Sequence, residues 1–314
     1  MPQRFPLLPE MEKFVALRSP KTSGERSVAT RRAEYNEYST QLARPLPNDL
    51  DVTNFNIPFA TAGIPVRLYQ PKSLRDAPAP CVVYFHGGGF VVGDLDSTEV
   101  IAAGIAERAH CNVINIDYPL SPEFPFPSAF DASYACIEWI SRNVEKLGVD
   151  AEKIVLTGDS CGANIAAAIT IASRDRGGPK IKGQILVNPW LSADMELESR
   201  KLFADGYGLT RAGLIYYLQA YLGSDASAQD NELAFPLNCT DLVGLPPTWV
   251  HVAECDPLKD DGRLFASKLI DAGVSVTYRE AKQCVHAFLR ARHMGEGTAA
   301  EFEAFAGFVR ASLA

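Results

Sequence analysis

A serine between two glycines is the residue of this chain best suited to nucleophilic chemistry. Residues 158–162 read Gly-Asp-Ser-Cys-Gly, between a short apolar run at 154–157 and an Ala/Ile-rich stretch at 163–176. These flanking segments predict a strand, a tight turn and a buried helix. Such a turn would hold Ser160 on a strained corner, with the next amide near the positive end of the helix, ready to receive an oxyanion.

The Gly-x-Ser-x-Gly pattern alone is weak evidence. It arises by chance in roughly one chain in ten of this composition. Its placement between a predicted strand and a predicted helix is the context that the motif requires. This context favours a nucleophilic Ser160.

A run of three glycines could supply the matching oxyanion donors. His86-Gly87-Gly88-Gly89-Phe90 follows directly after a predicted strand at 81–85. Bare backbone N–H groups at the carboxyl end of a strand can hold a developing oxyanion. The alternatives are a flexible loop or a phosphate cradle, but no Gly-Lys-Ser/Thr follows and no Gly-x-Gly-x-x-Gly pattern fits these positions.

A serine nucleophile needs a general base, and one histidine has a suitable position. His286 follows the last predicted strand, 274–278, by a short loop. His251 lies inside the predicted strand 248–253 and fits a core residue better. The remaining histidines are His86 in the glycine loop, His110 at the end of a helix and His293 in a polar turn.

The base in turn needs an acidic partner that fixes its tautomer and supports the imidazolium. Asp256 lies just past the preceding predicted strand, at the position on the sheet edge that matches His286. Asp260 and Asp261 follow in the expected first turn of a helix, where they fit better as partners of the helix dipole. The order Ser160, Asp256, His286 is the order found in α/β-hydrolases.

Five segments together resemble a known enzyme family, the hormone-sensitive-lipase-like esterases or bacterial family IV. They are His-Gly-Gly-Gly at 86–89, Asp-Tyr-Pro-Leu-Ser-Pro-Glu-Phe-Pro-Phe-Pro at 117–127, Gly-Asp-Ser-Cys-Gly at 158–162, Asp-Pro-Leu-Lys-Asp-Asp at 256–261 and His-Ala-Phe at 286–288. The resemblance implies the roles of nucleophile for Ser160, base for His286 and acidic partner for Asp256. It also implies an oxyanion hole formed by the amides of Gly88, Gly89 and Cys161. Finally, it implies hydrolysis of carboxylic esters without a metal or a cofactor.

The chain departs from the family pattern at four positions. Pro119 stands where Arg is usual, a change that concerns a structural ion pair of the family rather than its chemistry. Ser121 and Cys161 stand where Ala is usual, and Ala287 stands where Gly often follows the histidine. The last three changes could reshape the site slightly.

The apolar pattern predicts a mostly parallel, doubly wound sheet of about eight strands, and the resemblance implies that this sheet belongs to an α/β-hydrolase fold with a helical cap. Segments 52–59 and 64–69 alternate apolar and polar residues and predict an antiparallel hairpin. Six continuous apolar runs, separated by helical stretches, predict a parallel sheet covered on both faces, and they are 81–85, 113–116, 154–156, 185–187, 248–253 and 274–278. Thr298 and Glu301 look like a capping box for the last helix.

Three parts of the chain are expected. Residues 1–50 carry two amphipathic cap helices separated by a polar break at 19–25. Residues 51–190 and 237–314 form the catalytic domain. Residues 191–236 contain no strand-like run, so we expect a helical cap insertion that folds over the carboxyl edge of the sheet.

Four aromatic residues of the insertion are candidates for the substrate pocket, namely Phe203, Tyr207, Tyr216 and Tyr217. A pocket lined by them would be apolar and of limited size, which favours esters with short to medium acyl chains. The same aromatics could equally pack helices against one another.

Composition and charge argue against several classes of partner. The chain has 314 residues, of which 47% are hydrophobic, and a net charge of −8. Its 30 basic residues are scattered, so neither nucleic acid nor an anionic membrane surface is an expected partner. No apolar run approaches the roughly 20 residues of a membrane span, and no signal-peptide core follows the first methionine. We therefore expect a cytoplasmic protein.

The seven cysteines are expected to be reduced thiols rather than a disulfide framework or a zinc site. Their number is odd, and no Cys-x-x-Cys pair occurs. Three of them, Cys161, Cys255 and Cys284, border the proposed triad. They could be small buried hydrophobic residues, or they could make the site sensitive to oxidation and to soft metals.

Two other functions stay open on the sequence alone. A non-catalytic α/β-hydrolase could use the same pocket as a small-molecule receptor, although such proteins tend to lose a triad member and all three are present. An amidase or peptidase is the alternative within enzymes, but no charged subsite points to a peptide. The expected partner is a small-molecule ester. The edge strand at 274–278 could also pair two subunits into a homodimer.

Overall fold

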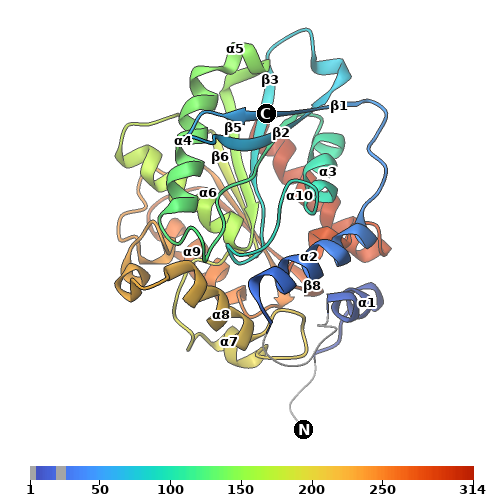
Figure 1. Cartoon of the computed structure of the whole chain (residues 1–314), viewed down its shortest axis with the longest axis vertical. Coiled ribbons are helices and arrows are strands. Elements are labelled where there is room, and N and C mark those ends of the chain that lie inside the picture. The colour runs from blue at the N-terminus through green and yellow to red at the C-terminus, as the bar shows by residue number, and fades with distance from the viewer. Residues whose placement is uncertain (1–4, 19–25) are drawn as a thin grey trace.

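An eight-stranded sheet forms the centre of the molecule (Figure 1). The computed structural model describes residues 5–18 and 26–314. The strands are β1 Leu50–Ile57, β2 Ile64–Pro71, β3 Ala79–Phe85, β4 Asn112–Ile116, β5 Val149–Asp159, β6 Gly183–Val187, β7 Thr248–Cys255 and β8 Val276–Val285. Their order in the sheet is β1-β2-β4-β3-β5-β6-β7-β8. β1 and β2 form the predicted antiparallel hairpin, β2 is antiparallel to β4, and all other neighbours are parallel. This sheet confirms the predicted α/β-hydrolase fold.

Helices cover both faces of the sheet (Figure 1). One face carries α4 (Ser128–Arg142), α6 (Cys161–Asp175) and α9 (Lys259–Asp271), the other carries α3 (Glu99–Ala109) and α10 (Glu296–Leu313), and the short α5 (Val144–Leu147) precedes β5.

Strand β3 shows how a central strand is buried on both faces of the sheet. Cys81, Val83 and Phe85 pack into the core on the α6 side. Val82 and Tyr84 pack into the core on the α3 and α10 side. Successive side chains of a strand point to opposite faces, so a strand covered on both faces has no position left for a polar residue without a partner.

Four further helices lie together at one end of the sheet (Figure 1). They are α1 (Pro9–Arg18) and α2 (Val28–Leu42) from the N-terminal part, and α7 (Glu198–Leu202) and α8 (Arg211–Leu222) from the predicted insertion. The two parts touch, because Phe5 N donates a hydrogen bond to the Tyr207 hydroxyl at 2.9 Å. The predicted polar break at 19–25 lies outside the described residues, and the bounds of the cap stay a prediction.

The last strand is longer than the sequence predicts. β8 begins at Val276, ends at Val285 and leads directly to His286, with no intervening loop. β8 is an edge strand with several half-buried and exposed positions, so its apolar pattern ends before the strand does. Tyr278 on this edge is 37% exposed. Pairing of two subunits through it stays a prediction.

The predicted capping box at Thr298 and Glu301 is wrong. α10 begins at Glu296, so Thr298 lies inside the helix and donates its hydroxyl hydrogen to the Ala291 carbonyl at 2.7 Å. Glu301 instead forms an ion pair with Arg279 at 2.7 Å. Tertiary contacts, which the local pattern does not reveal, use both side chains.

No helix in the described part of the chain combines the length and the hydropathy needed to cross a membrane.

Candidate active site

Ser160 lies where β5 ends and α6 begins, in the strand-turn-helix that the sequence predicts. Its φ is 58° and its ψ is −121°, a backbone conformation that residues other than glycine rarely adopt. Hydrogen bonds hold it there, from Ser160 N to Val187 O at 2.9 Å and from Trp190 N to Ser160 O at 3.2 Å. Strain of this kind costs about 1–3 kcal/mol and persists only where the surrounding structure enforces it.

Gly158 and Gly162 are needed because strand and helix approach too closely for a side chain. A Cβ atom on Gly158 would lie 2.3 Å from the carbonyl carbon of Gly162. A Cβ atom on Gly162 would lie 1.9 Å from the carbonyl oxygen of Phe85 in β3. The close approach places the first turn of α6 directly against the glycine loop that follows β3.

The glycine loop also depends on the absence of side chains. Gly88 has a φ of 136°, and a Cβ atom there would lie 1.9 Å from the carbonyl oxygen of Val92. Gly89 has a φ of 60°, and a Cβ atom there would lie 2.4 Å from the ring of Tyr217. Both glycines line one cavity together with Ser160. The loop backbone is therefore close enough to face a group bound to this serine.

Asp159 joins the glycine loop to the serine turn. Its Oδ1 accepts hydrogen bonds from the Tyr84 hydroxyl at 2.6 Å and from Gly87 N at 3.1 Å. Asp159 is buried, so water competes little for these bonds. Sequence reasoning assigned no role to Asp159, because nothing local shows that it faces Gly87.

The Cys161 thiol forms a second link between the same two segments. Phe90 N donates a hydrogen bond to Cys161 Sγ at 3.2 Å, and the Tyr118 hydroxyl lies 3.5 Å from the same sulfur. Burial raises the pKa of Cys161 to about 11, so the thiol is protonated at neutral pH. Cys161 is a packing and hydrogen-bonding group in this position.

The other cysteines are also free and buried. Burial raises the pKa of Cys255 to about 11 and that of Cys284 to about 12. Reactive cysteines need an appreciable thiolate fraction at neutral pH, which these thiols lack. Their environment favours the packing role over sensitivity to oxidation.

Asp256 and His286 follow the neighbouring strands β7 and β8 and lie side by side. His286 Nδ1 is 2.8 Å from Asp256 Oδ2, and both side chains are almost completely buried. The other carboxylate oxygen of Asp256 accepts a hydrogen bond from Leu258 N at 2.8 Å. With the neutral imidazole proton on Nδ1, facing Asp256, Nε2 is left as the proton acceptor.

The remaining buried histidines bond elsewhere. His86 Nδ1 lies 2.9 Å from the Gly87 carbonyl oxygen. His251 Nε2 lies 3.0 Å from a carboxylate oxygen of Glu301, and burial lowers the pKa of His251. Neither ring lines the cavity at Ser160. His251 is the core residue that the sequence predicts.

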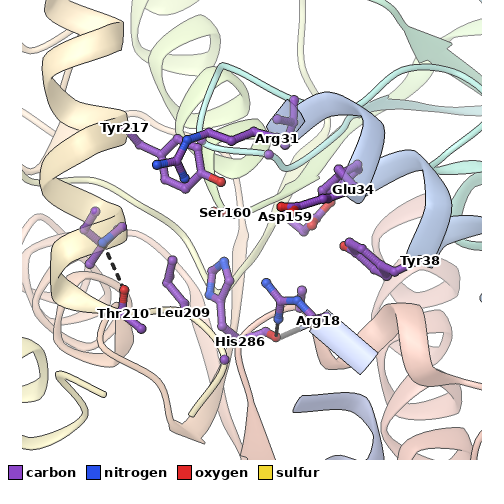
Figure 2. Close-up of a pocket in the computed structure, with 18 of the residues that line it drawn as sticks. Arg18, Arg31, Glu34, Tyr38, Asp159, Ser160, Leu209, Thr210, Tyr217 and His286 are labelled. Atoms are coloured by element: carbon purple, nitrogen blue, oxygen red, sulfur yellow. Dashed lines mark hydrogen bonds between the residues drawn. The ribbon is translucent and has the colours of Figure 1, made fainter. Parts of the chain in front are cut away.

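A cavity of about 200 Å³ contains the proposed nucleophile and base (Figure 2). Ser160 and His286 both line it. Among the hydrogen bonds of the described residues, none joins Ser160 Oγ to His286. Catalytic hydrogen bonds are often long until substrate binds. The lack of a hydrogen bond between Ser160 Oγ and His286 in the free enzyme is therefore compatible with proton transfer between these two side chains.

The structure places one of the four predicted pocket aromatics on the cavity wall, namely Tyr217 (Figure 2). Tyr216 is its neighbour, with 5.5 Å between ring centroids, and lies beneath the guanidinium of Arg31 at 3.7 Å. Phe203 and Tyr207 pack against each other, with 5.1 Å between their ring centroids. Neither of these two lines the cavity.

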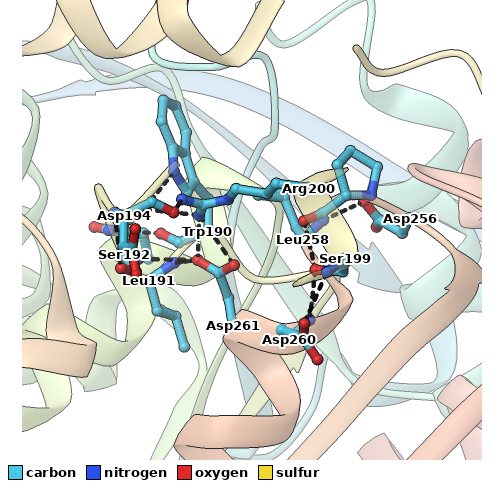
Figure 3. A network of polar contacts seen from close by, with 12 residues as sticks. Trp190, Leu191, Ser192, Asp194, Ser199, Arg200, Asp256, Leu258, Asp260 and Asp261 are labelled. Atoms are coloured by element: carbon cyan, nitrogen blue, oxygen red, sulfur yellow. Dashed lines mark hydrogen bonds and ion pairs between the residues drawn. The ribbon is translucent and has the colours of Figure 1, made fainter. Parts of the chain in front are cut away.

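A buried ion pair anchors the insertion close to Asp256 (Figure 3). Arg200 Nη2 donates to both carboxylate oxygens of Asp261, at 2.8 and 3.0 Å, and both side chains are fully buried. Asp261 Oδ1 also accepts hydrogen bonds from the amides of Leu191 and Ser192 at 2.9 Å. Asp261 thus lies in the first turn of α9, as expected, but its main partner is an arginine of the insertion.

Together these residues offer the parts of an acyl-transfer site. Ser160 presents a hydroxyl on a strained turn, and Asp256 and His286 form a hydrogen-bonded acid–base pair beside it. The glycine loop borders the same cavity. Within the residues that the structure describes, no group of three or more His, Cys, Asp or Glu side chains could hold a metal ion.

Comparison with known proteins first defines the class. The profile of a family described as having the alpha/beta hydrolase fold matches residues 82–290, well over half of the chain.

Relatives then narrow the class to esterases. Carboxylesterase NlhH of Mycobacterium tuberculosis (strain CDC 1551 / Oshkosh) is 41% identical over 230 residues, which cover 72% of this chain and 71% of NlhH. The arylesterase of Saccharolobus solfataricus is 32% identical over 251 residues, which cover 79% and 81% of the two chains. The crystal structure of a thermostable esterase from Pseudomonas putida ECU1011 matches with a TM-score of 0.92 at 26% identity and covers 99% of each chain.

The chain belongs to the hormone-sensitive-lipase-like esterases of the α/β-hydrolase fold, and it is a carboxylic ester hydrolase.

Proposed function

We propose that this enzyme hydrolyses short- to medium-chain carboxylic esters through an acyl-enzyme formed on Ser160, with His286 as the base and Asp256 as its partner. The observation that carries the proposal is the 2.8 Å contact between His286 Nδ1 and Asp256 Oδ2 at the cavity where Ser160 sits on its strained turn. The esterase relatives favour hydrolysis over the receptor function that the sequence left open.

Acylation begins with transfer of the Ser160 hydroxyl proton to His286 Nε2 while Oγ attacks the ester carbonyl carbon. The imidazolium is stabilised by the Asp256 carboxylate on the opposite side of the ring. The carbon–oxygen bond to the alcohol then breaks, and His286 returns the proton to the departing oxygen. The acyl group stays on Ser160.

Deacylation repeats these steps with water. His286 Nε2 takes a proton from a water molecule, whose oxygen attacks the acyl carbonyl carbon. The bond to Ser160 Oγ breaks, the serine recovers its proton from His286, and the carboxylic acid leaves. The site returns to its starting protonation state.

The amides of Gly88, Gly89 and Cys161 are the proposed donors to the oxyanion in both steps. The two glycines border the cavity, and Cys161 N belongs to the first turn of α6. One such donor contributes roughly 3–4 kcal/mol to transition-state stabilisation in a well-studied protease. Asp159 and the Cys161 thiol act indirectly, because they hold the glycine loop against the serine turn.

The size of the cavity supports the proposed chain length. Its volume of about 200 Å³ is below the roughly 300–1,000 Å³ of pockets for drug-sized ligands. Helices α1, α2 and α8 contribute side chains to its wall, so they act as the proposed cap. An acyl-length series should give its best rate at short to medium chains, and a maximum beyond about twelve carbons would contradict this part of the proposal.

The test is the rate of the Ser160→Ala variant on p-nitrophenyl acetate and butyrate. We expect turnover to fall by at least about 10⁴-fold, because the nucleophile is lost, while the melting temperature stays close to that of the wild type. Ser173→Ala is the matched control, since Ser173 is a buried serine of the same helix outside the cavity. Near wild-type rates in Ser160→Ala would refute the assignment.

A further inference from the structure

The cavity that holds the proposed nucleophile is lined by three arginines from the N-terminal part of the chain. Arg18 comes from α1, Arg31 comes from α2 and Arg26 lies just before α2. Figure 2 shows Arg18 beside His286, and Arg31 across the cavity next to Tyr217.

Only one of these arginines is paired with an acid among the described residues. Arg26 forms an ion pair with Glu34 at 2.8 Å. Arg18 Nη1 donates a hydrogen bond to the backbone carbonyl oxygen of His286 at 2.8 Å. A guanidinium has five N–H donors, so this bond leaves Arg18 further donors that no described residue accepts.

Arg31 is the more informative of the two, because one of its nitrogen atoms is buried without a hydrogen-bond partner among the described residues. Its guanidinium lies over the Tyr216 ring at 3.7 Å. Its Nε atom is buried and has no hydrogen-bond partner within residues 5–18 and 26–314. Buried donors are nearly always satisfied, so an unused one at a cavity wall points to a partner that binds there.

The charge balance of the cavity also favours an anion. Three arginines and two carboxylates, Glu34 and Asp159, line it within the described residues. This leaves one positive charge in excess, in a protein whose net charge is −8. Among the described residues, Asp159 forms no ion pair with Arg18 or Arg31, and its Oδ1 accepts hydrogen bonds from the Tyr84 hydroxyl and Gly87 N instead.

The surroundings of Tyr217 show that the fields of the three arginines overlap. Burial raises the pKa of the Tyr217 hydroxyl, and the charges of Arg31, Arg18 and Arg26 each act in the opposite direction. Tyr217 and all three arginines line the same cavity. A carboxylate placed there would be attracted by each of them.

We propose that this cavity selects esters that themselves carry a carboxylate group, and that Arg18 and Arg31 bind this group while Ser160 attacks the ester bond. The inference rests on the proposed ester hydrolysis at Ser160. The small volume of the cavity restricts the substrate to compact molecules, such as half-esters of short dicarboxylic acids or acylated hydroxy acids. Planar guanidinium groups suit carboxylates because two parallel N–H donors match the two oxygens.

The first experiment compares pairs of esters that differ only in charge. Monoethyl glutarate and its uncharged isostere ethyl glutaramate carry the carboxylate, or the amide that replaces it, in the acyl part of the ester. Acetoxyacetic acid and acetoxyacetamide place it in the alcohol part. We expect wild-type kcat/KM to favour the charged member of at least one pair by about tenfold or more, as for a charge-assisted hydrogen bond. The preference should shrink at high salt, because salt screens the attraction.

The second experiment tests whether Arg18 and Arg31 cause the preference for the charged ester. Arg31→Gln and Arg18→Gln should each reduce the charged-to-neutral ratio by about tenfold, and Arg31→Lys should retain part of it. Both rates in the ratio are measured on the same variant. A loosened helix that lowers activity on both esters alike therefore leaves the ratio unchanged. Arg142→Gln is the matched control, because Arg142 has a side chain 70% exposed, pairs with Glu138 and lies outside the cavity.

A third measurement needs no variant. Glutarate should inhibit hydrolysis of p-nitrophenyl acetate by the wild type competitively, at a concentration at least about tenfold lower than glutaramide does. Equal inhibition by the two compounds would contradict the inference even if the arginine variants failed to fold.

The outcomes separate this inference from the proposed function. Hydrolysis of p-nitrophenyl acetate with no preference for either charged ester would overturn the carboxylate inference and leave the esterase mechanism standing. A preference unchanged in both arginine variants would overturn the role of Arg18 and Arg31. Absence of turnover with every ester would instead refute the proposed function.

Discussion

Replacing Arg200 with methionine should strongly destabilise the fold, because it leaves a buried carboxylate without its counter-ion (Figure 3). Removing one partner of a buried ion pair typically costs about 3–5 kcal/mol of unfolding free energy. Asp261 would keep its hydrogen bonds from the amides of Leu191 and Ser192. We therefore expect a loss near the lower end of that range, about 3 kcal/mol at pH 8.

The loss should also depend on pH. Burial raises the pKa of Asp261 from its ordinary 3.8 to about 6, even with Arg200 beside it, and removing the positive charge should raise this pKa further. A carboxyl group with a higher pKa in the folded state stabilises the fold while it is protonated, and this contribution is lost as the pH rises through the folded-state pKa. The free energy of unfolding of the variant should therefore be closer to that of the wild type at pH 5, where Asp261 is protonated, than at pH 8.

Urea unfolding at pH 5 and pH 8 measures both effects. The control is the double variant Arg200→Met/Asp261→Leu, which removes both charges and should recover most of the lost stability, because apolar replacement of a buried pair is often neutral or stabilising. If Arg200→Met unfolds within about 1 kcal/mol of the wild type at both pH values, the pair does not have the stabilising role argued from its burial.

Three further predictions concern the proposed machinery. Asp256→Asn should lower kcat by about 10⁴-fold without changing the melting curve, because the amide favours the wrong histidine tautomer, and a loss below tenfold would contradict its role. Cys161→Ala should lower kcat about three- to tenfold by removing the acceptor of the Phe90 amide, whereas Cys161→Ser should retain more of the rate; equal rates in the two variants would exclude this positioning role. Gly162→Ala should give no folded protein by circular dichroism, since its Cβ would lie 1.9 Å from the Phe85 carbonyl oxygen, so a soluble, active variant would contradict the packing argument.

The turn at Ser160 could be predicted because its signals are local. Glycines at 158 and 162 and the change from an apolar run to an Ala-rich helix all lie within a short stretch. The same holds for the glycine loop. The predicted end of β8 is too early, because the apolar pattern stops at 278 while the strand continues to Val285, but the succession of β7 and β8 still brings Asp256 and His286 together. In a parallel sheet the carboxyl ends of neighbouring strands meet at one edge, so order along the chain already implies proximity.

The charged wall of the cavity could not be predicted, because it depends on where distant helices pack. Arg18 and Arg31 are distant from Ser160 in the sequence, and no local pattern shows that α1 and α2 place them in the same cavity. The bond from Asp159 to Gly87 and the pair between Arg200 and Asp261 are likewise tertiary contacts. For the four aromatic residues of the insertion, residue type alone does not show which of them line the cavity. Tyr217 does so, whereas Phe203 and Tyr207 pack against each other.

Covalent labelling of the active site tests whether Ser160 is the nucleophile. The enzyme is treated with a p-nitrophenyl alkylphosphonate, whose phosphorus is attacked by an activated serine with release of p-nitrophenolate, and the labelled peptide is identified by mass spectrometry. We expect one label per chain, on Ser160, with loss of esterase activity in proportion to labelling and no label in Ser160→Ala. Stoichiometric, inactivating labelling of a different residue, or undiminished labelling of Ser160→Ala, would contradict this role of Ser160.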